Sequence, residues 1–205
     1  MQHDFILLDR SGSMMDLWTE ALGSINAYVK KLADDKVDTG VTIATFDKDQ
    51  MRGVNMSFDI LRDRITPQTM HPLTDADAKP RGWTPLNDAV GRIVALAEKG
   101  NYDKVAIIIM TDGRENCSEE LNTAQAKALL DRCRAKNWQV IFLGANFDNA
   151  EQAASLGNFV GSTARVAKTK LAESTVAMAS MRSSYAATGA RMAFTDDQKA
   201  GLARE

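Results

Sequence analysis

Short apolar runs alternate along the chain with longer segments in which apolar residues recur every three or four positions. The short runs are continuous and rich in Ile, Val and Leu, which is typical of strands buried on both faces of a parallel sheet. The runs that we predict as strands are FILL within residues 4–8, TGVTIATFDK at 39–48, KVAIIIM at 104–110 and WQVIFLG at 138–144.

The longer segments have the periodicity of amphipathic helices. In the first of them, apolar residues fall on one helical face at Leu17, Ala21, Ile25, Tyr28 and Leu32. The segments that we predict as helices are residues 17–35, 86–99 and 118–136, and a short one that begins near Asp148.

Strands that alternate with helices predict an α/β fold with a doubly wound, mainly parallel, Rossmann-like sheet. We expect one antiparallel edge strand, formed by a hairpin partner at residues 51–58, and a last short strand at 158–161. Residues 62–81 are polar and contain three of the four prolines, so we predict mostly loop with at most one short strand.

The sequence after residue 163 has a different composition, rich in Ala, Ser and Thr. We therefore divide the chain into a domain at residues 1–163 and a helical C-terminal tail at 164–205. The tail is either the last helix of the domain or an arm that packs on a partner, and we favour the first for the part before Gly189. TDDQ at 195–198 predicts a capping box that opens a final helix. A helical apolar stripe supports the docked helix, at Leu171, Met178, Met181, Tyr185 and Met192.

Composition narrows the function classes. The formal net charge of −2 gives no electrostatic reason to expect nucleic acid or an anionic membrane as partner. The longest apolar run, residues 105–110, is far shorter than the roughly 20 residues of a membrane helix. Cys117 and Cys133 have neither zinc-site nor disulfide-framework spacing. The first residues lead directly into a predicted strand, so we expect no signal peptide and a cytoplasmic location.

Oxygen-bearing side chains follow the predicted strands. Asp9 ends the first strand, and Asp112 follows the strand at residues 104–110. Ser11 and Ser13 lie in the loop after Asp9, and Thr84 precedes a predicted helix start. Ligand sites of parallel sheets lie at the carboxyl ends of strands, so we expect these groups to meet. Carboxylates and hydroxyls favour Mg²⁺, or Mn²⁺ or Ca²⁺, over zinc or copper.

Three motifs resemble those of von Willebrand factor type A domains. DRSGS at residues 9–13 resembles the first metal loop of that family, GWTPLNDAVG at 82–91 its threonine segment, and IIIMTDG at 107–113 its second aspartate. Together they resemble a complete metal-ion-dependent adhesion site. The resemblance covers roughly residues 3–160. Within the family, the chain is most similar to small bacterial or phage-encoded members. The resemblance implies that Ser11, Ser13 and Thr84 contact the metal directly and that Asp9 and Asp112 bind it directly or through water.

The resemblance implies a protein–protein interaction module without catalytic activity. In such a module a divalent cation joins the domain to an Asp or Glu carboxylate of a partner protein. Relatives of this kind work with AAA+ ATPases or stress systems, and a phage-particle component fits equally. We expect neither nucleic acid nor membrane as a partner. The family couples this site to movement of its C-terminal helix, which would give the tail a regulatory role.

Several residues near the motifs have two interpretations. Arg10, Trp83 and Arg114 are candidates for a partner-binding rim, although each arginine alone is more often a solvated surface charge. We expect Met15 and Trp18 to be at least half-buried. The five candidate metal ligands could instead be helix caps or turn residues, which is the simpler interpretation of each one alone: Asp9, Ser11, Ser13, Thr84 and Asp112. Cys117 has no evident base beside it. We expect His3 on the surface, and His71 has no nucleophile motif near it, so a hydrolytic triad is not indicated.

The alternative function is a Mg²⁺-dependent phosphatase of the haloacid-dehalogenase type with Asp9 as nucleophile. Such enzymes place a second aspartate two positions later as acid and base, and this chain has Ser11 there. Loss of that group removes about 10²–10⁴-fold in rate. The expected later acids are also reduced to Asp148. The residues therefore favour binding over phosphate chemistry.

Overall fold

The computed structural model describes residues 1–205 except 50–55, 113–114, 145–155, 157–162, 166–169 and 203–205. A sheet of six strands in the order β3-β2-β1-β4-β5-β6 forms its centre. All neighbouring pairs are parallel except β2 and β3, which pair antiparallel at one edge. The strands are β1 (Gln2–Asp9), β2 (Gly40–Asp47), β3 (Ser57–Ile65), β4 (Lys104–Met110), β5 (Gln139–Gly144) and β6 (Thr163–Arg165).

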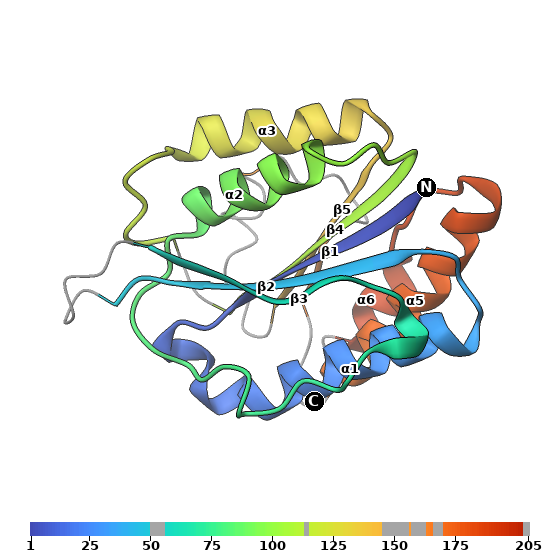
Figure 1. Ribbon diagram of the computed structural model, residues 1–205, viewed down its shortest axis with the longest axis horizontal. Helices are drawn as coiled ribbons and strands as arrows, with labels where there is room; N and C mark the ends of the chain where they lie inside the picture. The colour runs from blue at the N-terminus through green and yellow to red at the C-terminus, as the bar shows by residue number, and fades with distance from the viewer. Residues whose placement is uncertain (50–55, 113–114, 145–155, 157–162, 166–169, 203–205) are drawn as a thin grey trace.

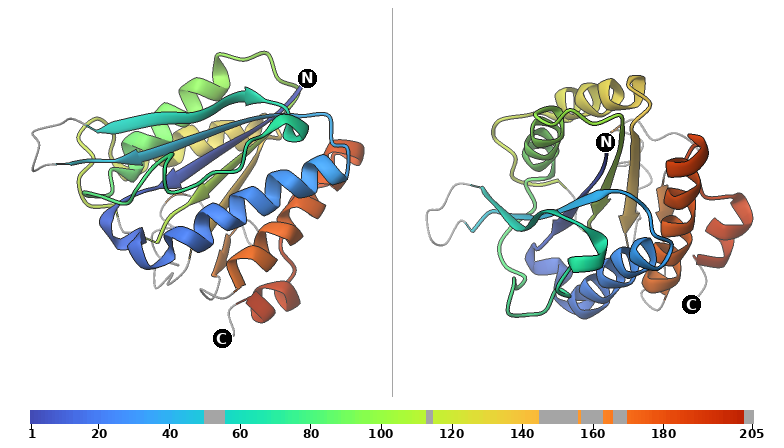
Figure 2. Two further views of the ribbon diagram at one scale, coloured as in Figure 1. Left: turned by 60° about the horizontal axis from the view of Figure 1, so that its bottom comes forward. Right: turned by 45° about the vertical axis from the view of Figure 1, so that its right-hand side comes forward.

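Helices cover both faces of the sheet (Figure 1). On one face, α2 (Leu86–Glu98) and α3 (Thr123–Ala135) pack over a core that includes Phe5 and Ile107. On the other face lie α1 (Trp18–Asp34), α5 (Leu171–Thr188) and α6 (Asp196–Leu202), as Figure 2 shows. The predicted doubly wound α/β fold with one antiparallel edge strand is confirmed.

The central strands form because their residues are apolar on both faces. In β4, every residue after Lys104 is buried, and the two faces of the strand contribute to separate cores. Short 3₁₀ helices, η1 (Gly12–Leu17) and η3 (Pro67–Thr69), precede α1 and follow β3. The capping box of α3 is formed by Asn122 and Gln125, so this helix starts after the acidic part of the segment predicted for it.

Two predictions near the edge strand need correction. The antiparallel strand runs over Ser57–Ile65, further along the chain than residues 51–58, so part of the predicted loop is strand. No residue of this edge strand is fully buried, half-buried and exposed residues follow one another in pairs, and its pairing with β2 contains register shifts. The short helix predicted near Asp148 and the strand predicted at 158–161 lie outside the described residues, and the described last strand is β6.

The C-terminal segment packs on the domain. Leu171, Met178 and Tyr185 of α5 are buried in the same core as α1, which supports the interpretation of α5 as a docked helix. Thr195 and Gln198 form the predicted capping box at the start of α6, where each side chain accepts a hydrogen bond from the other's backbone N–H. None of the helices in the described residues is long and apolar enough to cross a membrane.

Candidate metal site

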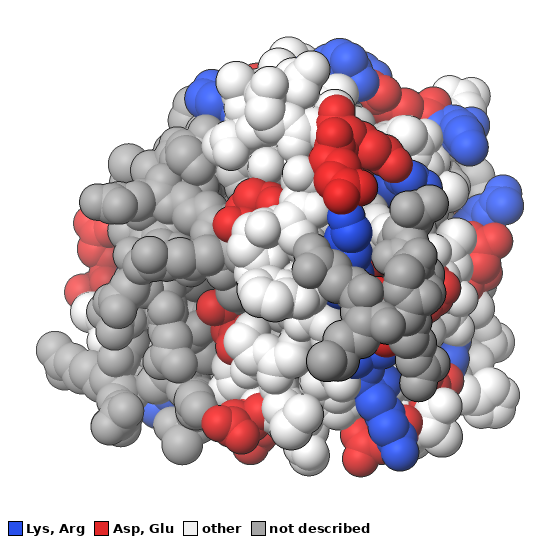
Figure 3. Space-filling model, turned by 90° about the vertical axis from the view of Figure 1, so that its left-hand side faces the viewer, with Lys and Arg blue, Asp and Glu red and all other residues white. Residues whose placement is uncertain are grey.

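The carboxyl ends of the parallel strands meet at one edge of the sheet, which Figure 3 shows from outside. The described part of this face is largely uncharged, with Asp and Glu side chains at several places and Lys and Arg side chains mainly toward one side. Asp9 is the last residue of β1 and has no exposed surface. Thr111 and Asp112 follow β4, which is the strand that pairs with β1. Parallel pairing therefore places the two acidic loops side by side, as the sequence predicts.

The carboxylate of Asp9 organises the first loop. It accepts a hydrogen bond of 2.7 Å from the backbone N–H of Ser11 and one of 2.5 Å from the hydroxyl of Thr111. Burial raises the pKa of Asp9 to about 6, and the carboxylate of Asp112 adds to the shift. No ion pair joins Asp9 to a Lys or Arg within the described part of the chain. A buried carboxylate without a cationic partner suits a bound cation.

The hydroxyls continue from Asp9 toward the second acid. The Ser11 Oγ and Ser13 Oγ atoms lie 3.1 Å apart, and the Ser13 hydroxyl donates a 2.9 Å hydrogen bond to Asp112 Oδ1. Four of the five predicted metal ligands thus form one connected group, which contains only oxygen donors. The described residues hold no cluster of three or more His, Cys, Asp or Glu side chains suited to a metal, so this donor set depends on its hydroxyls.

Backbone hydrogen bonds bring the threonine segment to the same edge. The N–H of Gly12 donates to the carbonyl of Gly82 over 3.0 Å. Thr84 is 2% exposed, and its backbone N–H and carbonyl are both paired with Asn116, at 3.0 and 3.2 Å. Thr84 is therefore buried, and it lies two residues after Gly82, which is hydrogen-bonded to Gly12 of the first loop.

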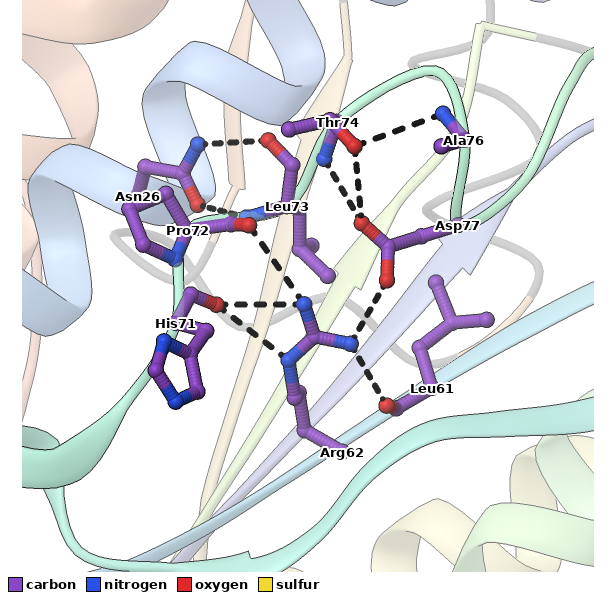
Figure 4. A network of polar contacts seen from close by, with 9 residues as sticks. All are labelled: Asn26, Leu61, Arg62, His71, Pro72, Leu73, Thr74, Ala76 and Asp77. Carbon is purple, nitrogen blue, oxygen red and sulfur yellow. Dashed lines mark hydrogen bonds and ion pairs between the residues drawn. The ribbon is translucent and has the colours of Figure 1, made fainter.

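The long segment before Thr84 is fixed by side chains rather than by regular structure (Figure 4). Arg62 of β3 donates to the carbonyls of His71 and Pro72 and to the carboxylate of Asp77. Asn26 of α1 exchanges two hydrogen bonds with the backbone of Leu73, at 3.0 and 2.7 Å. These contacts hold the polar segment before Thr84, a predicted metal ligand, in one position.

Trp83 lies at the surface on a fixed backbone. Its N–H and carbonyl form a two-bond bridge with Lys48, at 2.9 and 3.1 Å. Gly82 has a φ of +68°, and a Cβ there would lie 2.4 Å from the Lys48 carbonyl oxygen, so only glycine fits the turn before Trp83. The indole is 51% exposed despite this rigid support.

Some predicted positions differ from the structure. Arg10 is not at a rim: it is 6% exposed, and its guanidinium pairs with Asp59 and, at 2.7 Å, with the fully buried Asp47. A cation stabilises a buried carboxylate, and Arg10 is drawn inward to Asp47 in this way. Met15 is exposed at 66%, contrary to prediction, whereas Trp18 is buried as predicted. Arg114 lies outside the described residues.

His3 is the other correction, because it is buried in the sheet and not on the surface. Its Nε2 lies 2.9 Å from the Thr42 hydroxyl, and burial lowers its pKa to about 4. Burial also raises the pKa of the Cys117 thiol to about 11, and the carboxylate of Glu115 adds to that shift. Neither group has the properties of a nucleophile or general base at neutral pH.

Sequence reasoning left out three residues that support the site. Thr111 holds Asp9, and its position in the TDG motif is the signal that could have identified it. Asn116 pairs with the backbone of Thr84, and nothing in the sequence indicates this. Glu115 accepts hydrogen bonds from the backbone N–H groups of Asn87, Cys117 and Ser118, and so ties the second acidic loop to the start of α2.

Comparisons with known proteins identify the family and the fold of this chain. The profile of the von Willebrand factor type A domain matches residues 5–181. The von Willebrand factor domain of the type V pili tip protein Mfa5 from Porphyromonas gingivalis has a TM-score of 0.65 at 12% identity, with 96% of this chain and 98% of that chain covered.

Two further solved structures share the fold. The PilB minor pilin from Streptococcus sanguinis has a TM-score of 0.64 at 11% identity over 89% of this chain, which spans 61% of the pilin. The manganese-loaded TRAP protein of Plasmodium vivax has a TM-score of 0.57 at 16% identity, covering 84% of this chain and 71% of that one. No curated protein matches the chain significantly. At these identities the likeness shows a shared fold.

Proposed function

Because the chain belongs to the von Willebrand factor type A family, we propose that it is a metal-dependent protein–protein interaction module. Asp9, Ser11, Ser13, Thr84 and Asp112 hold a divalent cation, Mg²⁺ or alternatively Mn²⁺ or Ca²⁺. The observation that carries the proposal is the connected group of oxygen donors, in which Ser11 and Ser13 bridge the two acidic loops. This set matches hard cations and offers no nitrogen or sulfur ligand for zinc.

The domain's own residues prepare the site for a cation. Thr111 and the Ser11 N–H fix the orientation of the Asp9 carboxylate, and Asn116 fixes the backbone of Thr84. When bound, the cation offers a coordination position to an Asp or Glu carboxylate of a partner protein. An AAA+ ATPase, a stress-system protein or a phage-particle component remains the predicted class of partner.

The surface beside the site supplies a contact for the partner. Trp83 and Met15 are both exposed and lie in the two segments that carry Thr84 and Ser13. An exposed indole on a rigid backbone loses little conformational entropy on binding, which is the property of interface anchors. We therefore place Trp83 at the rim and leave out Arg10, whose charge is paired inside the domain. Arg114 remains a prediction.

The module is non-catalytic and cytoplasmic in this proposal. Ser11 occupies the position where a haloacid-dehalogenase phosphatase has its acid and base, and the family match gives that alternative no support. Cys117 and Cys133 are both free, which agrees with a reducing compartment.

A thermal melt with and without metal tests the site. At pH 7.5, above the pKa of Asp9, Mg²⁺ or Mn²⁺ at 100 times its Kd stabilises the fold by about 2.7 kcal/mol. For a domain of this size that corresponds to roughly 5–10 °C in Tm. The rise is expected in the wild type and in Ser180→Ala, an exposed serine on α5. The variant Ser11→Ala/Ser13→Ala, which removes two hydroxyls and little volume, is expected to lose it.

An equal rise in the double variant and the wild type would contradict the metal site. Pull-down of partners in Mg²⁺ and in EDTA then tests binding, and Trp83→Ala is expected to weaken capture without changing the metal-dependent Tm. Metal-dependent hydrolysis of a phosphate ester that is lost in Asp9→Asn would overturn the non-catalytic assignment.

A further inference from the structure

A hollow lies at the other end of the sheet from the candidate metal site. Its volume is about 560 Å³, which is within the range of roughly 300–1,000 Å³ for small-molecule sites. It is bounded by the start of β4, the turn from α3 into β5 and the segment after α5. None of the five proposed metal ligands lines it.

Positive charge is concentrated in this hollow. Among the described residues that line it, four side chains are cationic, those of Lys104, Arg134, Lys136 and Arg191, and one is acidic, that of Asp103. Asp103 is paired with the terminal amino group of Met1. The whole chain carries a net charge of −2, so the excess of cations is local. A hollow lined by one sign of charge focuses the electrostatic potential and attracts ions of the opposite sign.

Two of the cations form ion pairs with acids outside the lining of the hollow. Arg134 pairs with Asp131 at 2.9 Å and Lys136 with Glu98 at 2.7 Å, and neither carboxylate is among the described lining residues. Each of these carboxylates is shared with a second cation, Asp131 with Lys127 and Glu98 with Arg132.

Lys104 is held by neutral acceptors. Its Nζ donates to the backbone carbonyls of Tyr185 and Ala186, at 3.1 and 2.6 Å, in the last turn of α5. The positive charge of Lys104 interacts favourably with the negative, C-terminal end of the α5 helix dipole. None of the carboxylates in the described residues forms an ion pair with Lys104, so its charge also contributes to the potential of the hollow.

Hydrogen bonds fix the walls. The Tyr185 hydroxyl donates to the Asn137 carbonyl over 2.9 Å, and the Gln139 side chain accepts from the Met192 N–H over 3.0 Å. Gly189 ends α5 with a φ of +76°, which turns the chain back toward β5 before Arg191. The cationic groups are therefore attached to a preformed frame, which reduces the entropy lost on binding.

We propose that this hollow binds a small organic molecule that carries phosphate. Two guanidinium groups match the fork geometry of phosphate oxygens, and two ammonium groups add charge for a ligand with two or more negative charges. The volume exceeds that of a phosphate ion, so the ligand has an organic body. Asn137 and Gln139 offer polar contacts to that body, and Trp138 and Met192 offer apolar ones.

Calorimetric titration in excess EDTA tests the proposal, because the chelator removes metal bound to the domain and to the probes. Pyrophosphate and ATP are the probes, and citrate is the carboxylate comparison. The wild type is expected to bind ATP and pyrophosphate in preference to citrate. Lys136→Gln/Arg191→Gln is expected to bind both phosphates at least tenfold more weakly. The matched control Lys30→Gln/Lys79→Gln removes the same charge from exposed positions elsewhere and is expected to bind as the wild type does.

Three results would overturn the proposal. The first is the absence of binding by both phosphate probes. The second is an equal loss in the two double variants, which would indicate a general effect of net charge. The third is citrate binding as tight as that of pyrophosphate, which would indicate an anion patch without preference for phosphate. Because metal is absent throughout, none of these results depends on the metal site.

Discussion

Replacement of Arg182 by Met is expected to destabilise the fold strongly. Arg182 lies on α5, and its side chain has no exposed surface. Its guanidinium donates to Asp4 Oδ1 at 2.6 Å, to the Gln2 side chain at 2.9 Å and to the Thr39 hydroxyl at 3.1 Å. These contacts attach α5 to β1 and to the residue before β2.

The size of the expected loss of stability depends on Asp4, whose buried carboxylate has lost its cation in the variant. Asp4 is also fully buried, and burial raises its pKa while Arg182 opposes that shift. In Arg182→Met the carboxylate keeps the hydroxyl of Tyr28, at 2.8 Å, but has no cation. Removal of one partner of a buried ion pair costs about 3–5 kcal/mol. For a domain of this size, a Tm decrease on the order of 10 °C is expected.

Urea denaturation at pH 7 and pH 5 measures the effect. In the variant, the folded pKa of Asp4 lies further above its unfolded value, so the folded state binds more protons and stability decreases as pH rises between these two pKa values. The loss of stability relative to the wild type at the same pH is therefore expected to be smaller at pH 5 than at pH 7. Adding Asp4→Asn removes the unpaired charge and is expected to restore most of the loss at pH 7.

The control is Arg92→Met, because Arg92 pairs with Glu120 at the surface. Surface pairs contribute about 0–1 kcal/mol, so little change is expected. A loss below 1 kcal/mol for Arg182→Met, or no recovery with Asp4→Asn, would refute the reasoning.

Two further predictions concern His3 and Gly82. Burial lowers the pKa of His3 in the folded state to about 4, so the unfolded chain takes up a proton first as the pH falls below about 6.5. The free energy of unfolding, measured by urea titration, is therefore expected to decline from pH 6.5 to 4. His3→Gln is expected to make this decline shallower, and His71→Gln, at an exposed position, is the control. Gly82→Ala is expected to lower the free energy of unfolding by more than about 2 kcal/mol, because its Cβ would meet the Lys48 carbonyl in a residue with positive φ. Gly23→Ala, inside α1 and with open space around it, is expected to raise that free energy by about 0.5–1 kcal/mol. Similar effects of the two substitutions would contradict the argument that the turn requires glycine.

The central elements were predictable because one physical pattern decides each of them. After its first residue, Lys104, the run KVAIIIM has no polar position to expose, so it becomes a central strand with the predicted bounds. The edge strand β3 was displaced in the prediction, because its charged residues are typical of loops and only pairing with β2 makes them strand. His3 was placed at the surface because it precedes the predicted first strand, whereas in the structure it lies within β1 and contacts Thr42 and Phe5.

The sequence by itself determined the α/β class, the central strands and the group of acid and hydroxyl residues proposed to bind metal. These follow from local pattern, because hydrophobic periodicity selects each element and strand ends collect in one place in a parallel sheet. Only the tertiary structure decided which buried charges are paired. Arg10 turns inward to Asp47, and Arg182 joins Asp4 across 178 positions of sequence. Such pairs depend on which side chains folding leaves without solvent, and no local pattern contains that information.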